Sequence, residues 1–368
     1  MARMQIEGLC KGWDFPVIDR LDLTVEEGEF FVIVGPSGIG KTTLLRLIAG
    51  LETANAGRIA IGDQDITALP PYKRPVAMTF ESYALYPHLS VFENIASPLR
   101  ARRMDTAAIR AAVNEVAELL RIEALLDSRP GEISGGQKQR TALGRTLVAK
   151  PRVFLLDEPI SHLDAKIRHE LRQQFHSLEE LRRVATLYVT HDYSEALSLG
   201  DRIGVMGRGG LVQVGSAREV FMRPRTLFVA EHLGQPAINA VAAHIGGEGA
   251  DLHVRAGNSG FGFPIGGTRA AALSGARHAR VTVGIRPQHI KVLRNGEDAP
   301  GHHVIEGHVE IYEALGANGV LVADAGGISL TALTSPEHAF AHGQPVRLAL
   351  RTDAVFYFDS ETGDNLLL

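Results

Sequence analysis

The chain has 368 residues, of which 45% are hydrophobic and 22% charged, and its formal net charge is −4. These values are typical of a globular protein of two or three domains, and they leave no excess of basic residues for binding nucleic acid. The single cysteine, Cys10, excludes a disulfide within the chain. No apolar run approaches the roughly 20 residues of a membrane span, so we expect membrane association only through a partner.

Up to about residue 235, short apolar runs alternate with helical patterns. The runs Phe30–Val34, Val153–Leu156 and Ala185–Val189 are typical of buried strands in a parallel sheet. Between the first two, apolar residues over Leu44–Ile48 predict a short helix that Gly50 ends. Strands that alternate with helices favour an α/β domain, which we place at residues 1–235.

Beyond residue 235 the helical pattern fades, and Gly234-Gln235-Pro236 marks the expected linker. Short apolar segments separated by Gly, Asn, Asp and Pro predict strands instead. These segments are Val281–Arg286, Val309–Leu315, Gly319–Ala323, Val346–Arg351 and Ala354–Phe358. We therefore predict a small all-β barrel or sandwich over residues 236–368.

A glycine-rich loop stands between the first predicted strand and the first helix. It consists of Gly35, Pro36, Ser37, Gly38, Ile39, Gly40, Lys41, Thr42 and Thr43. This order matches the G-x-x-x-x-G-K-[ST] pattern, whose backbone N–H groups surround phosphate oxygens. We expect Lys41 to reach the β- and γ-phosphates of ATP, and the Thr42 hydroxyl to bind Mg²⁺.

Two carboxylates end the predicted strand that begins at Val153. Asp157 suits the binding of Mg²⁺, and Glu158 suits a general base that polarises the attacking water. With the phosphate loop upstream, the pair predicts ATP hydrolysis.

A second anion-binding helix start is predicted at Ser134, Gly135, Gly136 and Gln137. One nucleotide does not need two such sites from the same chain. We therefore expect this segment to cover the γ-phosphate of an ATP molecule held by another subunit.

Together these motifs resemble an ABC-transporter ATPase over residues 1 to about 235, with Ile133 where the family usually has Leu. The resemblance implies a helical subdomain at about 88–150 and a homodimer that encloses two ATP molecules. It also implies that Trp13 stacks on adenine and that His191 contacts the γ-phosphate. The segment Ser161-His162-Leu163-Asp164 resembles the loop at the dimer interface, which would bring Asp164 to the nucleotide.

One position departs from the family. The segment that begins at Met78 resembles the family's Q-loop, but Glu81 replaces the glutamine. An ionised Glu81 would bind Mg²⁺ more strongly and would lie near Glu158, and two close carboxylates tend to raise one pKa. The replacement either changes the rate of hydrolysis or leaves turnover intact.

The C-terminal region resembles that of carbohydrate-importer ATPases, the maltose, trehalose, polyol and glycerol-phosphate group. The segments concerned are Phe228–Pro236, Gly284–Ile290 and Val355–Asp359, and they imply an OB-like domain of the TOBE type. Importer ATPases of polyamines, iron or sulfate share this architecture and remain an alternative. An ABC ATPase that acts on nucleic acid is a further alternative, but the chain lacks the long coiled-coil insertion or tandem cassettes of that class.

The resemblance also implies partners. Two integral-membrane permease subunits would contact the Tyr83–His88 segment, and a periplasmic or extracellular solute-binding protein would act indirectly. The chain would then be the ATP-hydrolysing subunit of a bacterial importer, on the cytoplasmic side of the inner membrane. We predict no nucleic-acid partner.

Overall fold

The computed structural model describes residues 3–161, 163–177, 181, 183–247, 251–273, 280–294 and 296–368. The chain forms two compact units, Met1–Val220 and Phe221–Leu368. Residues 221–235, which the change in composition assigns to the first domain, belong to the second unit in this division.

The first unit is built on a sheet of six strands in the order β10-β9-β3-β8-β7-β6. Neighbours from β9 to β6 run parallel, and β10 runs antiparallel to β9. The strands are β3 (Phe30–Val34), β6 (Val76–Thr79), β7 (Val153–Asp157), β8 (Ala185–Thr190), β9 (Arg202–Gly207) and β10 (Gly210–Gly215). Every residue of β3, β7 and β8 is buried, which explains why these strands appear in the sequence as unbroken apolar runs. The predicted α/β domain is confirmed.

A second, antiparallel sheet has the order β2-β1-β4-β5. Its strands are β1 (Met4–Gly12), β2 (Pro16–Val25), β4 (Ala56–Ile61) and β5 (Gln64–Asp65). It shares one apolar core with helix α1 (Lys41–Ala49) and with the central sheet, in which Ile6, Leu44 and Ile33 are each buried. This sheet was not predicted, and register shifts interrupt the pairing of β1 with both of its neighbours.

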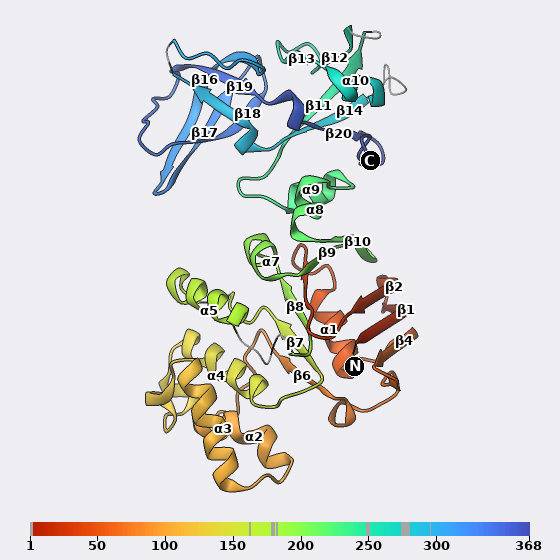
Figure 1. Ribbon diagram of the computed structural model, residues 1–368, viewed down its shortest axis with the longest axis vertical. Helices are drawn as coiled ribbons and strands as arrows, with labels where there is room; N and C mark the ends of the chain where they lie inside the picture. The colour runs from red at the N-terminus through yellow and green to blue at the C-terminus, as the bar shows by residue number, and fades with distance from the viewer. Residues whose placement is uncertain are drawn as a thin grey trace. The chain divides into compact units, whose positions relative to one another are not determined.

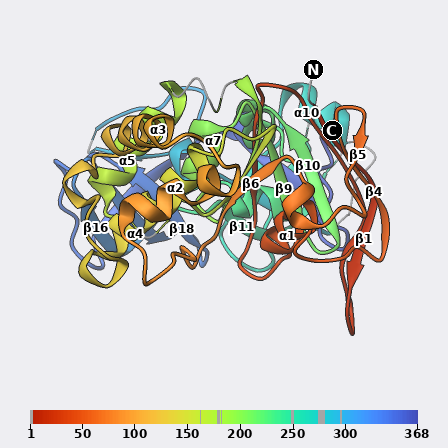
Figure 2. The ribbon, with the colours of Figure 1, turned by 90° about the horizontal axis from the view of Figure 1, so that it is seen from below.

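Further α-helices that the structure describes in this unit are α2 (Val91–Ala101), α3 (Thr106–Leu119), α4 (Gly135–Leu147), α5 (Ala165–Ser177) and α7 (Tyr193–Leu199). Helix α8 (Ala217–Met222) spans the division between the units. Ser90 and Asp105 cap α2 and α3 by accepting backbone N–H bonds. Within the unit, α2, α3 and α4 gather on the side of the central sheet away from β1 and β4 (Figures 1 and 2).

The second unit contains two five-stranded sheets around one apolar core. The first has the order β13-β12-β11-β14-β20, formed by β11 (Asn239–Gly246), β12 (His253–Arg255), β13 (Gly262–Pro264), β14 (Arg280–Ile285) and β20 (Phe356–Asp359). The second has the order β15-β19-β16-β17-β18, formed by β15 (Ile290–Leu293), β16 (His303–Leu315), β17 (Asn318–Asp324), β18 (Ser329–Thr334) and β19 (Pro345–Leu350). Two short helices, α9 (Leu227–His232) and α10 (Gly267–Leu273), complete it. The predicted β-rich C-terminal domain is confirmed.

Arg286, directly after β14, is the largest fully buried side chain of the second unit. Its guanidinium donates to the carbonyl oxygens of Leu233 at 2.5 Å and Phe221 at 2.6 Å, and it lies 3.7 Å from the centre of the Phe221 ring. Burial lowers the pKa of Arg286 to about 10. The side chain therefore ties the segment that precedes β11 to the sheet.

Candidate functional site

Three of the predicted functional segments follow the carboxyl ends of adjacent parallel strands. In the β3–β8 pair Val34 lies opposite Thr190, and in the β7–β8 pair Asp157 lies opposite Val189. The loop after β3, His191 after β8 and Glu158 after β7 therefore meet at one edge of the sheet, where open α/β sheets place their ligands.

The phosphate loop at Gly35–Gly40 needs glycine for two different reasons. Gly40 has φ +114°, a backbone conformation that residues with a Cβ rarely adopt. A Cβ at Gly35 would lie 2.5 Å from the carbonyl oxygen of Met206 on β9. Conformation at one end of the loop and close packing at the other therefore fix its path.

Lys41, the first residue of α1, folds back over this loop. Its Nζ donates to the carbonyl oxygens of Gly35 at 2.8 Å and Pro36 at 3.0 Å. Burial lowers the pKa of Lys41, while the carboxylates of Glu158, Asp157 and Glu81 act in the opposite direction. The ammonium group therefore stands among the loop and the acidic residues that are predicted to surround the nucleotide.

Thr42 and Asp157 form the predicted metal-binding pair. The Thr42 hydroxyl donates to Oδ1 of Asp157 at 3.1 Å, and Asp157 is 2% exposed. Burial raises the pKa of Asp157 to about 6, helped by the nearby charges of Glu158 and Glu81 and opposed by the bond from Thr42. A hydroxyl and a carboxylate that adjoin in this way are oxygen donors of the kind Mg²⁺ prefers, so these residues fit that ion.

Glu158 and His191 lie in direct contact. The Nδ1–H group of His191 donates to Oε2 of Glu158 at 2.9 Å. Glu158 itself has φ +46°, in the left-handed region, and its backbone N–H donates to the carbonyl oxygen of Val189 at 3.0 Å. The predicted base and the predicted γ-phosphate contact therefore come together in one chain.

A buried network, which the sequence analysis missed, holds the backbone on both sides of His191. Glu195 is 1% exposed, and its Oε2 accepts hydrogen bonds from Tyr188 at 2.7 Å and Thr190 at 2.8 Å. The Thr190 oxygen in turn accepts from the backbone N–H of Asp192 at 2.9 Å. Burial raises the pKa of Glu195. Since Thr190 and Asp192 flank His191, the network fixes where its side chain starts.

Glu81 follows the short strand β6, which pairs with β7. Its carboxylate lies near enough to Lys41 and Asp157 to act on the pKa of both. The next residues are held by Arg145 of α4, which donates to the carbonyl oxygens of Tyr83 at 2.9 Å and Ala84 at 2.7 Å. The segment predicted to contact the membrane subunits is therefore attached to the helix that begins at Ser134.

Ser134 caps α4, with Gly135, Gly136 and Gln137 in its first turn. Ser134 Oγ accepts from the N–H of Gln137 at 3.4 Å, and the Gln137 side chain accepts from the N–H of Ser134 at 2.8 Å. Among the residues that the structure describes, no hydrogen bond or ion pair joins Ser134–Gln137 to the phosphate loop. These two predicted halves of the nucleotide site are not brought together by bonds within one chain.

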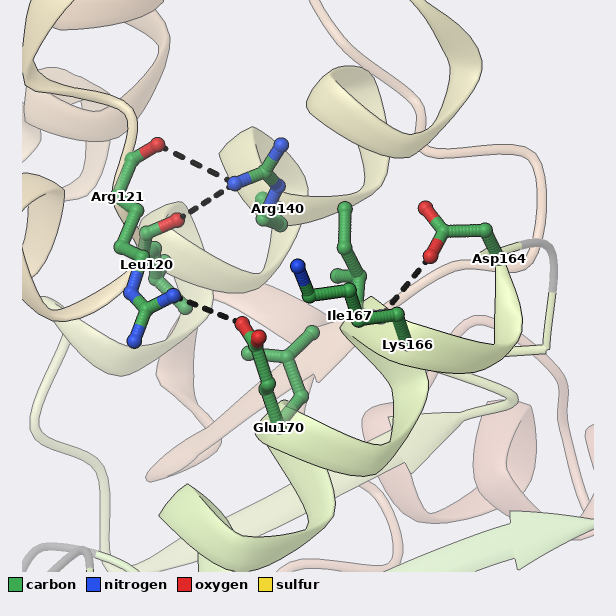
Figure 3. Close-up of a pocket in the computed structure, with 8 residues that line it drawn as sticks. Leu120, Arg121, Arg140, Asp164, Lys166, Ile167 and Glu170 are labelled. Carbon is green, nitrogen blue, oxygen red and sulfur yellow. Dashed lines mark hydrogen bonds and ion pairs between the residues drawn. The ribbon is translucent and has the colours of Figure 1, made fainter.

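Asp164 caps α5 by accepting the backbone N–H of Ile167 at 3.0 Å. Figure 3 shows it across a pocket of about 360 Å³ from Arg140 of α4, while Arg121 and Glu170 form an ion pair of 2.8 Å at another wall. His162, in the predicted interface loop, lies outside the described residues. No hydrogen bond of Asp164 with the phosphate loop is present among the described residues.

Trp13, the predicted adenine contact, is 60% exposed, and Nζ of Lys11 lies 4.6 Å from the centre of its ring. Beside the phosphate loop is a cavity of about 720 Å³. Its lining includes Ser37 and Gly38 of the loop, together with Phe15, which is 67% exposed. Phe15 is a second aromatic candidate for the base, and only its position two residues after Trp13 could have indicated it in the sequence.

The phosphate loop, the acidic end of β7 and the histidine after β8 define a nucleotide-hydrolysing protein of the P-loop class. Comparison with known proteins identifies the family. Residues 18–161 match the ABC transporter family, and residues 283–358 match the TOBE domain. Within the described residues, no helix has both the length and the apolar character needed to cross a membrane.

Curated relatives match over nearly the full chain. An sn-glycerol-3-phosphate import ATP-binding protein, UgpC, of Yersinia pseudotuberculosis is 40% identical, with 99% of each chain covered. The UgpC of Ruegeria pomeroyi is 42% identical, covering 100% of this chain and 99% of the relative. A diacetylchitobiose uptake system ATP-binding protein, MsiK, of Streptomyces coelicolor is 41% identical over 95% of each.

Solved structures of an ABC transporter cassette resemble the first part of this chain. The dimeric structure of MJ0796, a bacterial ABC transporter cassette, is 27% identical and has a TM-score of 0.55, covering 58% of this chain and 99% of that one. A post-hydrolysis state of MJ0796 bound to ADP and Pi matches equally well. The chain belongs to the ABC transporter family, among the ATP-binding proteins of import systems, and it is an ATPase. The predicted family is thereby confirmed.

Proposed function

We propose that two copies of this chain enclose two ATP molecules, each held between Gly35–Thr43 of one copy and Ser134–Gln137 of the other. The observation that carries this proposal is the capped start of α4, a second anion-binding terminus that no bond links to the phosphate loop of its own chain, within the described residues. The dimeric state of MJ0796 supports the same arrangement. In the proposed dimer of this chain, Trp13 stacks on adenine, and Asp164 approaches the nucleotide across the dimer.

The chemistry follows from the groups at the sheet edge. Lys41 exchanges its bonds with the loop carbonyl groups for phosphate oxygens. Thr42, Asp157 and Glu81 would hold Mg²⁺, which when bound would help to neutralise the charge of the phosphates. Glu158 accepts the proton of the attacking water, and His191, next to it, orients the γ-phosphate.

The solute class follows from the relatives. Those named for sn-glycerol-3-phosphate and diacetylchitobiose match nearly the full chain, including the region of the TOBE domain. We therefore assign this protein to the importers of carbohydrates, polyols or glycerol phosphates. Residues 1–235 act as the nucleotide-binding domain, and residues 236–368 act as an OB-like regulatory domain.

The partners are two integral-membrane permease subunits and, through them, an external solute-binding protein. The Tyr83–His88 segment receives the permease on the cytoplasmic side of the inner membrane. Its attachment to Arg145 supports this role, because any movement of α4 is passed to the carbonyl groups of Tyr83 and Ala84.

A Glu158→Gln variant tests the proposed site. The variant should bind ATP, form a closed dimer on size exclusion and hydrolyse ATP far more slowly than the parent protein. Turnover at the parent rate would refute Glu158 as the base. Uptake of labelled glycerol 3-phosphate and of disaccharides by vesicles that contain the co-purified permease then tests the solute class. Uptake of polyamine, iron or sulfate alone would contradict it.

A further inference from the structure

Gln139, two residues beyond Gln137 on α4, makes a contact that the site described above does not use. Its side chain is 4% exposed, and its Nε2 donates to the backbone carbonyl oxygen of Glu158 at 3.1 Å. The hydroxyl of Ser161 donates to the same oxygen, also at 3.1 Å. The backbone N–H of Ser161 also donates to this oxygen, at 3.4 Å. The Glu158 carbonyl group therefore receives one bond from α4 and two from its own loop.

These bonds matter because of the backbone at Glu158. With φ +46°, Glu158 has a left-handed conformation that residues with a Cβ adopt only when their surroundings impose it. Its N–H group is fixed by Val189 of β8, and its carbonyl group is fixed by Gln139 and Ser161. Without the bond from Gln139, the peptide after Glu158 is held by Ser161 alone, and the carboxylate loses part of its orientation.

The other end of the same amide supports a role beyond packing. Among the described residues, Oε1 of Gln139 is buried and has no hydrogen-bond partner. A buried polar atom without a partner is unfavourable, so an apolar residue of similar size would suit this place better if packing were the only requirement. What Gln139 adds is the bond to Glu158.

Gln139 lies close to the start of α4, so its bond links that start to Glu158. Ser134 caps the helix, and Gln139 lies little more than one turn later, about 7 Å along the axis. A displacement of the first turn of a helix moves the next turn with it, because backbone hydrogen bonds link successive turns. We propose that Gln139 is a positioning residue through which α4, closing on the ATP of one site, sets the orientation of Glu158 in the other site.

This inference rests on the proposed dimer. There, Ser134–Gln137 of a chain covers the ATP bound by its partner, whereas Glu158 of that chain acts on its own ATP. A change at Gln139 that acted only through the helix start would impair the partner's site. A change that acts through Glu158 impairs the site of its own chain. The two routes are thus separable by experiment.

The test uses mixed dimers of full-length chains that carry two different affinity tags. One chain keeps Glu158 and the other carries Glu158→Gln, so that a single site hydrolyses ATP. Gln139→Leu is introduced either into the chain that keeps Glu158 or into the other chain, and kcat and KM for ATP are measured. The parent mixed dimer, without a change at Gln139, is measured first.

We expect Gln139→Leu in the chain that keeps Glu158 to lower kcat about tenfold more than the same change in the other chain, with a smaller effect on KM. Gln139→Glu, which has nearly the same shape but presents a carboxylate to the carbonyl oxygen, should behave as Gln139→Leu does. Ser161→Ala, which removes a donor to the same oxygen without involving α4, should also lower kcat when it is placed in the chain that keeps Glu158.

Equal effects in both chains, or no effect in either, would overturn the inference while leaving the dimer intact. A parent mixed dimer that neither closes on ATP nor hydrolyses it would overturn the dimer and the inference together. Thermal unfolding of each variant checks folding. If Gln139→Leu fails to fold, the comparison rests on Gln139→Glu, and equal kcat values from its two placements would still count against the inference.

Discussion

The carboxyl edge of the central sheet and the paired sheets of the C-terminal unit are built by opposite rules. At the edge, Glu158 has a left-handed backbone, and Lys41 and Asp157 are charged groups that are almost fully buried. In the C-terminal unit, β11 alternates between buried and exposed residues from Asn239 to Ile245, as a half-buried strand should. In the same unit, the buried guanidinium of Arg286 donates to backbone carbonyl groups.

The two regions differ in where unfavourable burial and backbone strain occur. Unfavourable burial and backbone strain gather where three strands end together, a place at which they serve chemistry. In the C-terminal unit, a buried charge serves connection between segments. Changes at the edge should therefore alter the rate of hydrolysis, and changes in the C-terminal unit should alter stability.

The largest expected effect is on His191. His191→Ala removes the group that contacts Glu158, and we expect kcat for ATP to fall about 10²–10³-fold, as for other preorganised donors. His342→Ala is the matched control, because His342 is exposed and its side chain bonds to the Glu310 carbonyl group, away from the phosphate loop in the sequence. Comparable losses in both variants would remove the contrast between the two regions.

Arg286→Met tests the opposite side of the comparison. It leaves the carbonyl groups of Leu233 and Phe221 without their donor, at a cost of about 1–3 kcal/mol each. Calorimetry should show a destabilised C-terminal unit, while kcat for ATP stays near the parent value. Arg286→Lys, which can keep one bond, should be intermediate. A fall in kcat without a fall in stability would contradict this assignment.

Base binding gives an effect of intermediate size. Stacking of a base on an aromatic ring contributes about 1–3 kcal/mol. Replacing the ring that holds adenine by alanine should therefore raise KM for ATP about tenfold. Trp13→Ala and Phe15→Ala, measured side by side, decide between the predicted ring and the one that lines the cavity. A larger effect for Phe15 would move the base away from the predicted position.

Thr190→Val should act less strongly. The change removes a donor to Glu195 and the acceptor for the Asp192 backbone, which flanks His191. We expect kcat to fall about fivefold, which corresponds to about 1 kcal/mol, because the two lost bonds act on His191 only through its neighbours. Thr190→Ser keeps both bonds and should restore kcat. If valine and serine give the same rate, the network has no part in placing His191.

The smallest effect is expected at Glu81. Its side chain is exposed, and the amide oxygen of glutamine can also face Mg²⁺. Glu81→Gln should therefore keep Mg²⁺-dependent hydrolysis, with a change in kcat below about threefold, because solvent screens an exposed charge. Abolished turnover would mean that the carboxylate has become essential.

The strands of the central sheet and the phosphate loop could be predicted, because each follows from residues that are adjacent in the sequence. Phe30–Val34 and Val153–Asp157 are buried on both faces, so their apolar runs mark them as strands. The loop before Lys41 follows a fixed spacing of residues that chemistry demands. By contrast, Gln139 and Glu195 act through partners that are distant in sequence or concealed among ordinary helical residues. The contacts of Gln139 and Glu195 become visible only when the strands are paired and α4 is packed in the structure.

The division of each ATP site between two chains is tested most directly by mixing two inactive proteins. Lys41→Ala impairs the phosphate loop, and Ser134→Arg blocks the start of α4. In a symmetric dimer, an equal mixture leaves about a quarter of all sites with both halves intact. We predict from this division of the site that the mixture hydrolyses ATP well above the sum of the separate variants. A mixture no more active than that sum would contradict it.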